Sequence, residues 1–84
     1  MFLEIVTPDE KIYTGEIEAV KVPGSKGEFE VLENHAAIVS TLTNGTVRVT
    51  EKGNNKQFYT ISSGVIEVLK NKVVILAESA TTQK

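Results

Sequence analysis

Residues 22–36 read VPGSKGEFEVLENHA, and this stretch holds the clearest fold signal in the chain. Pro23-Gly24 is a strong turn dipeptide, because proline fixes φ and glycine tolerates the backbone angles of tight turns. Beyond the turn the residues alternate, which places Phe29 and Val31 on one face and acidic side chains on the other. The stretch therefore predicts a turn followed by a half-buried β-strand.

Short runs of the same kind, each closed by turn residues, recur along the whole chain. No helical period of useful length interrupts them. Many short strands at such spacing indicate a sandwich or a flattened barrel. The sequence thus predicts an all-β fold of mostly antiparallel strands. The expected strands span residues 2–6, 11–14, 16–22, 28–32, 36–42, 46–50, 57–61, 65–69 and 73–77.

Two connections carry specific turn predictions. Asn44-Gly45 is the favoured dipeptide of a type I′ turn, so a hairpin is expected there. Asn71-Lys72 is expected to be a second two-residue connection. Both predictions place the flanking strands next to each other in one sheet.

The chain has 84 residues, which is enough for one small domain. Residues 1–78 are expected to form this β domain, and residues 79–84 a frayed polar tail. With no cysteine and one histidine, neither a disulfide scaffold nor a nitrogen–sulfur metal cluster is expected, and no cofactor. No run approaches the roughly 20 apolar residues of a membrane-spanning helix. No basic, apolar-cored leader opens the chain, which favours a cytosolic location.

The net charge of −2 is unevenly distributed. Residues 1–33 hold eight acidic residues and three lysines, a balance of −5, whereas residues 34–84 have a balance of +3. The acidic half argues against nucleic acid as a partner, because nucleic-acid-binding domains present a basic face. It favours a partner with basic loops, unless these charges only solvate strand faces.

Two segments near the C-terminus are apolar at successive positions instead of alternating. They are Val65-Ile66 and residues 73–76, VVIL. A strand of that kind is usually covered on both sides, but a lone small sandwich exposes its outer faces to water. The uncovered apolar surface predicts a partner-binding site. The alternative is that loops or a chain terminus cover it.

No arrangement of residues predicts catalysis. His35 is the single histidine, and no serine stands at a spacing that selects it as a nucleophile. Residues 24–27, GSKG, lack the interval and the following helix of a phosphate-binding loop. Glu28 and Glu30 share one strand face, but an open face lacks the burial that tunes acid–base carboxylates. We therefore expect no enzyme.

One alternative function is a free-standing β-sandwich that binds a peptide or a glycan. Such a module needs an aromatic platform, whereas the three phenylalanines and two tyrosines are scattered over several strands. A small enzyme, the third possibility, needs a convergent polar pocket that the sequence does not indicate.

The order of the motifs resembles the epsilon subunit of the rotary ATP synthase. The matching segments are LEIVTPD at residues 3–9, VPGSKGEFEVLENHA at 22–36, SSGVIEV at 62–68 and VVILAE at 73–78. The resemblance covers nearly the whole chain and concerns only that subunit's N-terminal β domain. It implies a flattened ten-stranded β-sandwich at the foot of the central stalk, and a rotor subunit instead of a catalyst.

The resemblance also implies partners and site residues. The partners are the gamma subunit and the polar loops of the membrane-embedded c-ring, between which the domain would couple proton flow to ATP synthesis. The implied location is the cytoplasmic face of the bacterial plasma membrane, where the complex holds the domain peripherally. The residues expected to face the c-ring are Gly27, Glu28, His35 and Ala36, and those expected to face gamma are Ser40, Ser62, Gly64, Val65 and Glu67.

Three positions depart from the family pattern. The family often has glycine where this chain has Glu30 and Asn34, and proline where it has Ala37. Asn34 can adopt the left-handed conformation of a glycine, so the turn is expected to survive. Most members also continue into a C-terminal helical hairpin that can inhibit ATP hydrolysis or bind ATP, so neither activity is assigned to these 84 residues. The polar, untagged tail favours a natural short form over a truncated one.

Overall fold

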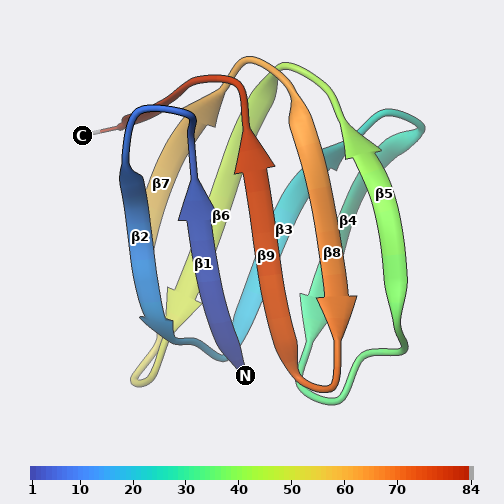
Figure 1. Ribbon diagram of the computed structural model, residues 1–84. Coiled ribbons are helices and arrows are strands. Elements are labelled where there is room, and N and C mark those ends of the chain that lie inside the picture. Colours follow the sequence, from blue (N-terminus) through green and yellow to red (C-terminus); the bar gives the residue numbers. More distant parts are fainter. Residues whose placement is uncertain (84) are drawn as a thin grey trace.

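The computed structural model describes residues 1–83, which form ten strands and no helix (Figure 1). All nine expected strands are present, with ends that shift by up to three residues, and the all-β prediction is confirmed. No helix that could span a membrane is found in these residues. The strands are β1 (Phe2–Val6), β2 (Lys11–Glu16), β3 (Ala19–Gly24), β4 (Gly27–Leu32), β5 (Ile38–Leu42), β6 (Gly45–Glu51), β7 (Asn55–Ile61), β8 (Gly64–Leu69), β9 (Lys72–Ala77) and β10 (Ala80–Thr82).

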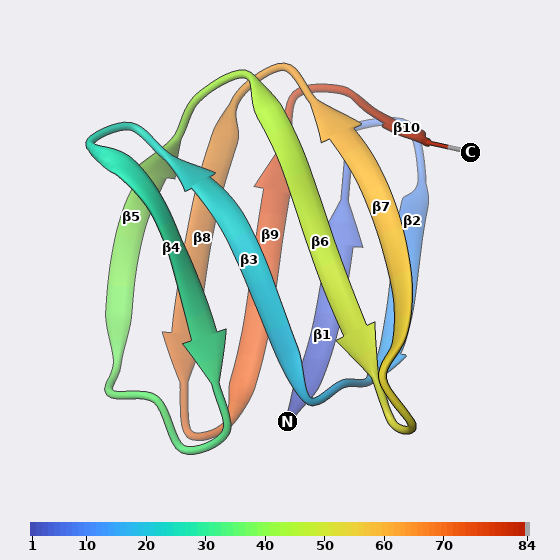
Figure 2. The ribbon, with the colours of Figure 1, turned by 180° about the vertical axis from the view of Figure 1, so that it is seen from behind.

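The ten strands form one continuous sheet that folds into two facing layers. The layer with the order β5-β8-β9-β1-β2 lies in front in Figure 1, and the layer with the order β4-β3-β6-β7-β10 lies in front in Figure 2. A single residue pair, Gly24 with Leu42, joins β3 to β5 and links the layers at one corner. Within residues 1–83, β1 and β9 pair in parallel and the other strand pairs are antiparallel. The predicted β-sandwich is confirmed.

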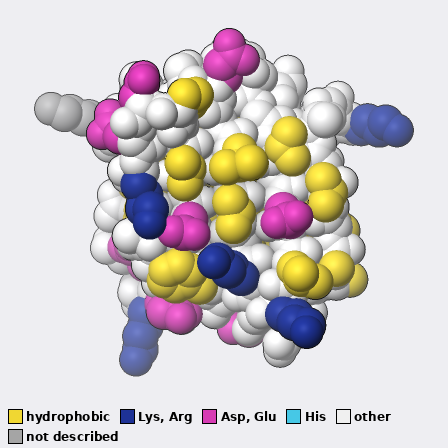
Figure 3. Space-filling model, in the orientation of Figure 1, with side chains coloured by type: hydrophobic (Ala, Val, Ile, Leu, Met, Phe, Trp, Pro, Cys, Tyr) yellow, Lys and Arg dark blue, Asp and Glu magenta, His cyan; other side chains and the backbone are white. Residues whose placement is uncertain are grey.

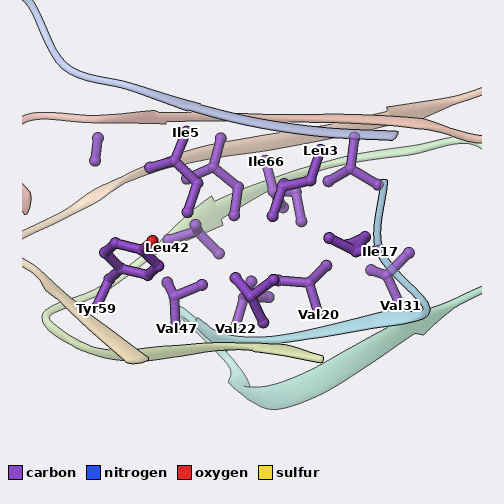
Figure 4. Close-up of a cluster of buried hydrophobic side chains, with 14 of the residues drawn as sticks. Leu3, Ile5, Ile17, Val20, Val22, Val31, Leu42, Val47, Tyr59 and Ile66 are labelled. Atoms are coloured by element: carbon purple, nitrogen blue, oxygen red, sulfur yellow. The ribbon is translucent and has the colours of Figure 1, made fainter. Parts of the chain in front are cut away.

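The hydrophobic core lies between the two layers. Leu3 and Ile5 of β1 point across it toward Val20 and Val22 of β3, and none of the four has exposed surface (Figure 4). Each fully buried side chain of this size contributes about 1.5–3 kcal/mol through its removal from water. Val31 of β4 is buried as well, as the alternation of its strand predicts.

Asn44-Gly45 does not form the expected hairpin, so that prediction is wrong. The strand before it, β5, pairs with β8 in one layer, while the strand after it, β6, pairs with β3 and β7 in the other. The connection therefore crosses between layers. Gly45 serves a close approach instead, because a Cβ at this position would lie 2.8 Å from the Cβ of Pro23.

The hairpin between β8 and β9 is present, but its turn lies one residue earlier than expected. Leu69 pairs with Lys72 at the end of the ladder, so Lys70 and Asn71 form the two-residue connection. Their φ angles are 49° and 64°. Two successive positive φ angles are what a type I′ turn requires.

The expected frayed tail is a tenth strand. Residues 80–82 form β10, which pairs antiparallel with β7. The Gln83 backbone N–H donates to the Phe58 carbonyl at 2.9 Å, and the Gln83 side chain donates to the Thr46 hydroxyl at 3.1 Å. The physical reason is that β7 would otherwise end the layer with unpaired backbone groups. Position 84, the last of the predicted tail, lies outside the described residues.

Candidate partner-binding face

The outer side of the β5-β8-β9-β1-β2 layer carries a continuous apolar patch, here named the apolar face. Leu76 of β9 has Val65 of β8 as its cross-strand neighbour on one side and Val6 of β1 on the other. Figure 3 shows hydrophobic side chains gathered over the middle of this side of the molecule. The apolar face consists of Val6, Val39, Val65, Leu69, Val74 and Leu76.

The apolar face exists because β8 and β9 are apolar at successive positions. Ile66 and Ile75 point inward and are fully buried, so the residues beside them must point outward. Val39 and Leu76 keep 71% and 56% of their surfaces exposed. Cover by a loop or a chain terminus, the alternative considered for these strands, is therefore not found within residues 1–83.

Two carboxylates interrupt the apolar face, and their surroundings differ. The Glu4 carboxylate pairs with the Lys11 ammonium at 2.9 Å and with the Lys72 ammonium at 3.7 Å. The hydrogen bond from Lys11 lowers the pKa of Glu4 below its usual value. Glu67, on β8, is exposed, and its side chain has no hydrogen bond or ion pair with any residue from 1 to 83.

The residues expected to face gamma are only partly brought together. Val65 and Glu67 point outward on β8 and share the apolar face. Gly64 lies at one end of this face, in the lining of an open apolar depression beside Leu76. Ser62 precedes β8, where its hydroxyl accepts a hydrogen bond from the Ser79 hydroxyl at 3.0 Å.

Ser40 does not share the apolar face. It pairs across β5 and β8 with Ile66, which is buried, so both side chains leave the sheet on its inner side. The Ser40 side chain lines a depression between β5 and the β3–β4 turn, where Phe29 is a neighbour. The gamma-facing role of these residues stays a prediction.

The acidic turn joins β3 to β4. Gly24 and Gly27 close the ladder, and the two residues between them form the connection. Glu28, the next residue, is exposed and pairs with the Lys21 ammonium at 3.4 Å. Glu30 lies on the same outer side and pairs with the Arg48 guanidinium at 3.1 Å. These carboxylates thus form a solvated ladder of charges.

His35 and Ala36 lie far from the acidic turn. They follow the end of β4, whereas Glu28 lies near its start. The four-residue step from Glu28 to Leu32 along this strand spans about 13 Å. The His35 backbone N–H donates a hydrogen bond to the Leu32 carbonyl at 3.1 Å. Asn34 has the expected left-handed φ of 63°. The four residues expected to face the c-ring therefore do not lie at one end of the domain, and their contact with a ring stays a prediction.

Two polar clusters join residues that are distant in the chain, so no local sequence pattern predicts them. The Met1 amine contacts Glu33 at 2.9 Å and Glu16 at 3.2 Å, and the hydrogen bond to Glu33 raises the pKa of this amine. The Tyr13 hydroxyl donates a hydrogen bond to Glu51, 38 positions later. Within residues 1–83, no group of three or more histidine, aspartate and glutamate side chains is placed to hold a metal ion.

The fold is that of a small β-sandwich domain, and one of its outer sides is apolar and exposed. The family described as "ATP synthase, Delta/Epsilon chain, beta-sandwich domain" matches residues 1–83. The chain belongs to this family, and the resemblance to ATP synthase epsilon subunits is confirmed.

Similar curated proteins are described as ATP synthase epsilon chains. An ATP synthase epsilon chain of Campylobacter curvus is 40% identical over 80 residues, which are 95% of this chain and 62% of that protein. The ATP synthase epsilon chain of Campylobacter jejuni is 43% identical over 77 residues, which are 92% of this chain and 60% of that protein. The chain thus spans about 60% of the length of these relatives.

Two solved assemblies contain a similar fold. A chain in the mitochondrial ATP synthase of Euglena gracilis, solved as OSCP, F1 and c-ring, has a TM-score of 0.90 and 29% identity; the match covers 95% of this chain and 51% of that one. A chain in the central stalk and c-ring of the Tetrahymena thermophila mitochondrial ATP synthase has a TM-score of 0.82 and 14% identity; the match covers 96% of this chain and 65% of that one. The second likeness concerns the fold alone.

Proposed function

We propose that this domain is a non-catalytic part of the central stalk of a proton-translocating ATP synthase. There it links the gamma subunit to the c-ring and so couples proton flow to ATP synthesis. Family membership supports this role, as do relatives that are epsilon chains of bacterial ATP synthases. The domain then lies at the cytoplasmic face of the plasma membrane, where the complex holds it peripherally.

The observation that carries the proposal is the apolar face. Small soluble domains rarely keep side chains such as Leu76 and Val39 this exposed in one contiguous patch, and patches of that kind mark protein interfaces. The gamma subunit is the partner assigned to this face. Burial of the outward valines and leucines then supplies the main free energy of association.

The acidic turn is the surface assigned to the c-ring. Glu28 leaves the turn with its carboxylate in water, close to Lys21. Charges at a wet rim contribute orientation and association rate more than affinity. The proposed ring contact therefore positions the domain, while the apolar face holds it to gamma.

Transmission of rotation requires a domain that deforms little between its proposed contacts with gamma and with the c-ring. The core residues between the layers have almost no exposed surface, and close-packed interiors transmit strain with little deformation. A two-layer sandwich with partners on different sides suits this mechanical task. No step of the proposed role needs a catalytic group on this chain.

The test is calorimetric titration of the purified chain with the gamma subunit of the same organism. Saturable one-to-one binding is expected for the wild type. Leu76→Asp, and Val65→Asp beside it, should weaken binding roughly tenfold or more, because each places a charge in an apolar contact.

The matched control is Leu32→Asp. Leu32 is 54% exposed, close to the 56% of Leu76, but it lies on β4 in the other layer. This variant should bind gamma like the wild type. A folded wild-type domain that does not bind at tens of micromolar overturns the proposal and favours a peptide- or glycan-binding module.

A further inference from the structure

Within residues 1–83, the Glu67 carboxylate has no hydrogen-bonding or ion-pair partner, although it lies among the side chains of the apolar face. We infer that the surface covering this face is apolar around one basic side chain, a lysine or arginine that pairs with Glu67. The inference rests on the proposed function, since it describes the chemistry of the partner's contact surface. It makes Glu67 a specificity determinant within an otherwise apolar interface.

The position of Glu67 is central and not at a rim. It lies on β8, which β5 and β9 flank on both sides. Its cross-strand neighbours are Val39 on β5 and Val74 on β9. Directly opposed residues of a sheet have Cβ atoms about 4.5–5.5 Å apart. Val65 and Leu69 precede and follow it on the same side of its own strand.

The four nearest outward neighbours of Glu67 are therefore apolar. A partner that covers them also removes water from the carboxylate between them. A buried carboxylate without a counter-charge costs more free energy than the burial of one apolar side chain returns. An entirely apolar partner surface would thus be penalised at its centre.

Glu4 shows how the fold treats the other carboxylate of this face. It is the neighbour of Val74 on β1, in the same cross-strand row as Glu67. Lys11 and Lys72 both pair with it. The domain therefore supplies the counter-charge for Glu4 itself and leaves Glu67 for an external cation.

A lysine or arginine is the group that fits. Its charged end satisfies the carboxylate through charge-assisted hydrogen bonds. Its aliphatic stem can lie against the surrounding valines and leucines, since such side chains bury their methylenes and keep the charge at the tip. A partner without this cation would be rejected, which is a recognised route to specificity.

The experiment compares gamma-subunit binding of Glu67→Leu and of the wild type by calorimetry, at low and at high salt. Leucine enlarges the apolar face, so it would raise the affinity for an entirely apolar partner surface and lower it for a surface with the inferred cation. If the partner has the inferred cation, Glu67→Leu leaves that cation unpaired, and the affinity should fall by about 30-fold or more. Glu67→Gln keeps a hydrogen-bonding side chain without the charge, so its affinity should lie between those of the wild type and Glu67→Leu. High salt should lower the affinity of the wild type more than that of Glu67→Leu.

Glu18→Leu is the matched control, because Glu18 is exposed in the connection between β2 and β3 and away from the apolar face. It should bind like the wild type, and thermal melting should show that all variants fold. Glu67→Leu affinity equal to or tighter than that of the wild type overturns the inference and leaves the proposed function standing. Absence of wild-type binding overturns the proposed function and the inference with it.

Discussion

The Tyr13 hydroxyl donates a hydrogen bond to the Glu51 carboxylate, and this bond connects β2 in one layer to the end of β6 in the other. The Tyr13 ring also meets the Tyr59 ring edge to face, with centroids 6.0 Å apart and an interplanar angle of 71°. The backbone joins the layers at the β3–β5 corner. Tyr13 and its partners therefore hold together the opposite side of the sandwich.

Tyr13→Phe should lower the free energy of unfolding by about 1 kcal/mol, because it removes a partly buried hydrogen bond to a charged group. Urea denaturation at neutral pH measures the change. Tyr59→Phe is the control, since the Tyr59 hydroxyl has no hydrogen bond to residues 1–83. Equal losses in the two variants would mean that the Glu51 contact contributes nothing.

Alkaline pH should weaken the domain through the same residue. Burial, and then the Glu51 carboxylate, raise the pKa of Tyr13 above its usual value of 10.0. The folded state therefore keeps the proton while the unfolded chain loses it, so stability is full below about pH 10 and falls as pH rises further. Urea denaturation between about pH 9 and pH 11 should show a smaller decline in Tyr13→Phe than in the wild type. Identical declines would contradict the assignment.

Gly64→Ala should destabilise the domain by about 1–3 kcal/mol. A Cβ at Gly64 would overlap the Leu76 carbonyl oxygen and lie 3.1 Å from the Ala77 Cα, so the backbone must move. Gly15→Ala is the matched control within a strand, because its Cβ would meet the Tyr13 hydroxyl at an ordinary 3.4 Å. Thermal melting of both variants checks the prediction, and an unchanged midpoint for Gly64→Ala would refute it.

Glu28→Lys should weaken coupling and leave the fold intact. The exposed pair with Lys21 contributes little stability, whereas the new lysine reverses the charge of the acidic turn. The measurement is ATP-driven proton pumping by the assembled complex, with Glu18→Lys as the control for net charge. Unchanged pumping in the Glu28 variant would argue against a ring contact at this turn.

Local patterns were enough to predict most strands of this fold. The alternation that buries Val31 and exposes Glu30 can be seen in five residues, so it needs no distant information. The hairpin predicted at Asn44-Gly45 was wrong because a dipeptide indicates how sharply the chain can turn. It does not indicate which layer the next strand joins. The strand β10 escaped because both of its threonines are exposed at an edge, where no apolar period is required.

The candidate site also has features that local sequence patterns predict and features that they do not. Successive apolar residues at 73–76 predicted an uncovered face, since one side of a strand can enter the core and the other cannot. Strand register between distant segments decides that Glu4 pairs with Lys72 and that the Glu67 side chain has no partner within residues 1–83. The separation of Glu28 from His35 follows from the direction of β4, which a list of motifs does not contain.

The parallel pairing of β1 with β9 sets an order for biosynthesis. Residues 2–6 leave the ribosome well before residues 72–77, which are their partner in the middle of the layer. Contacts between such distant segments form late, because a long loop must close before they are made. Val6 and Leu76 come from these two strands, so the apolar face is incomplete until both have been synthesised. The proposed binding of a partner at this face must therefore wait until translation has delivered β9.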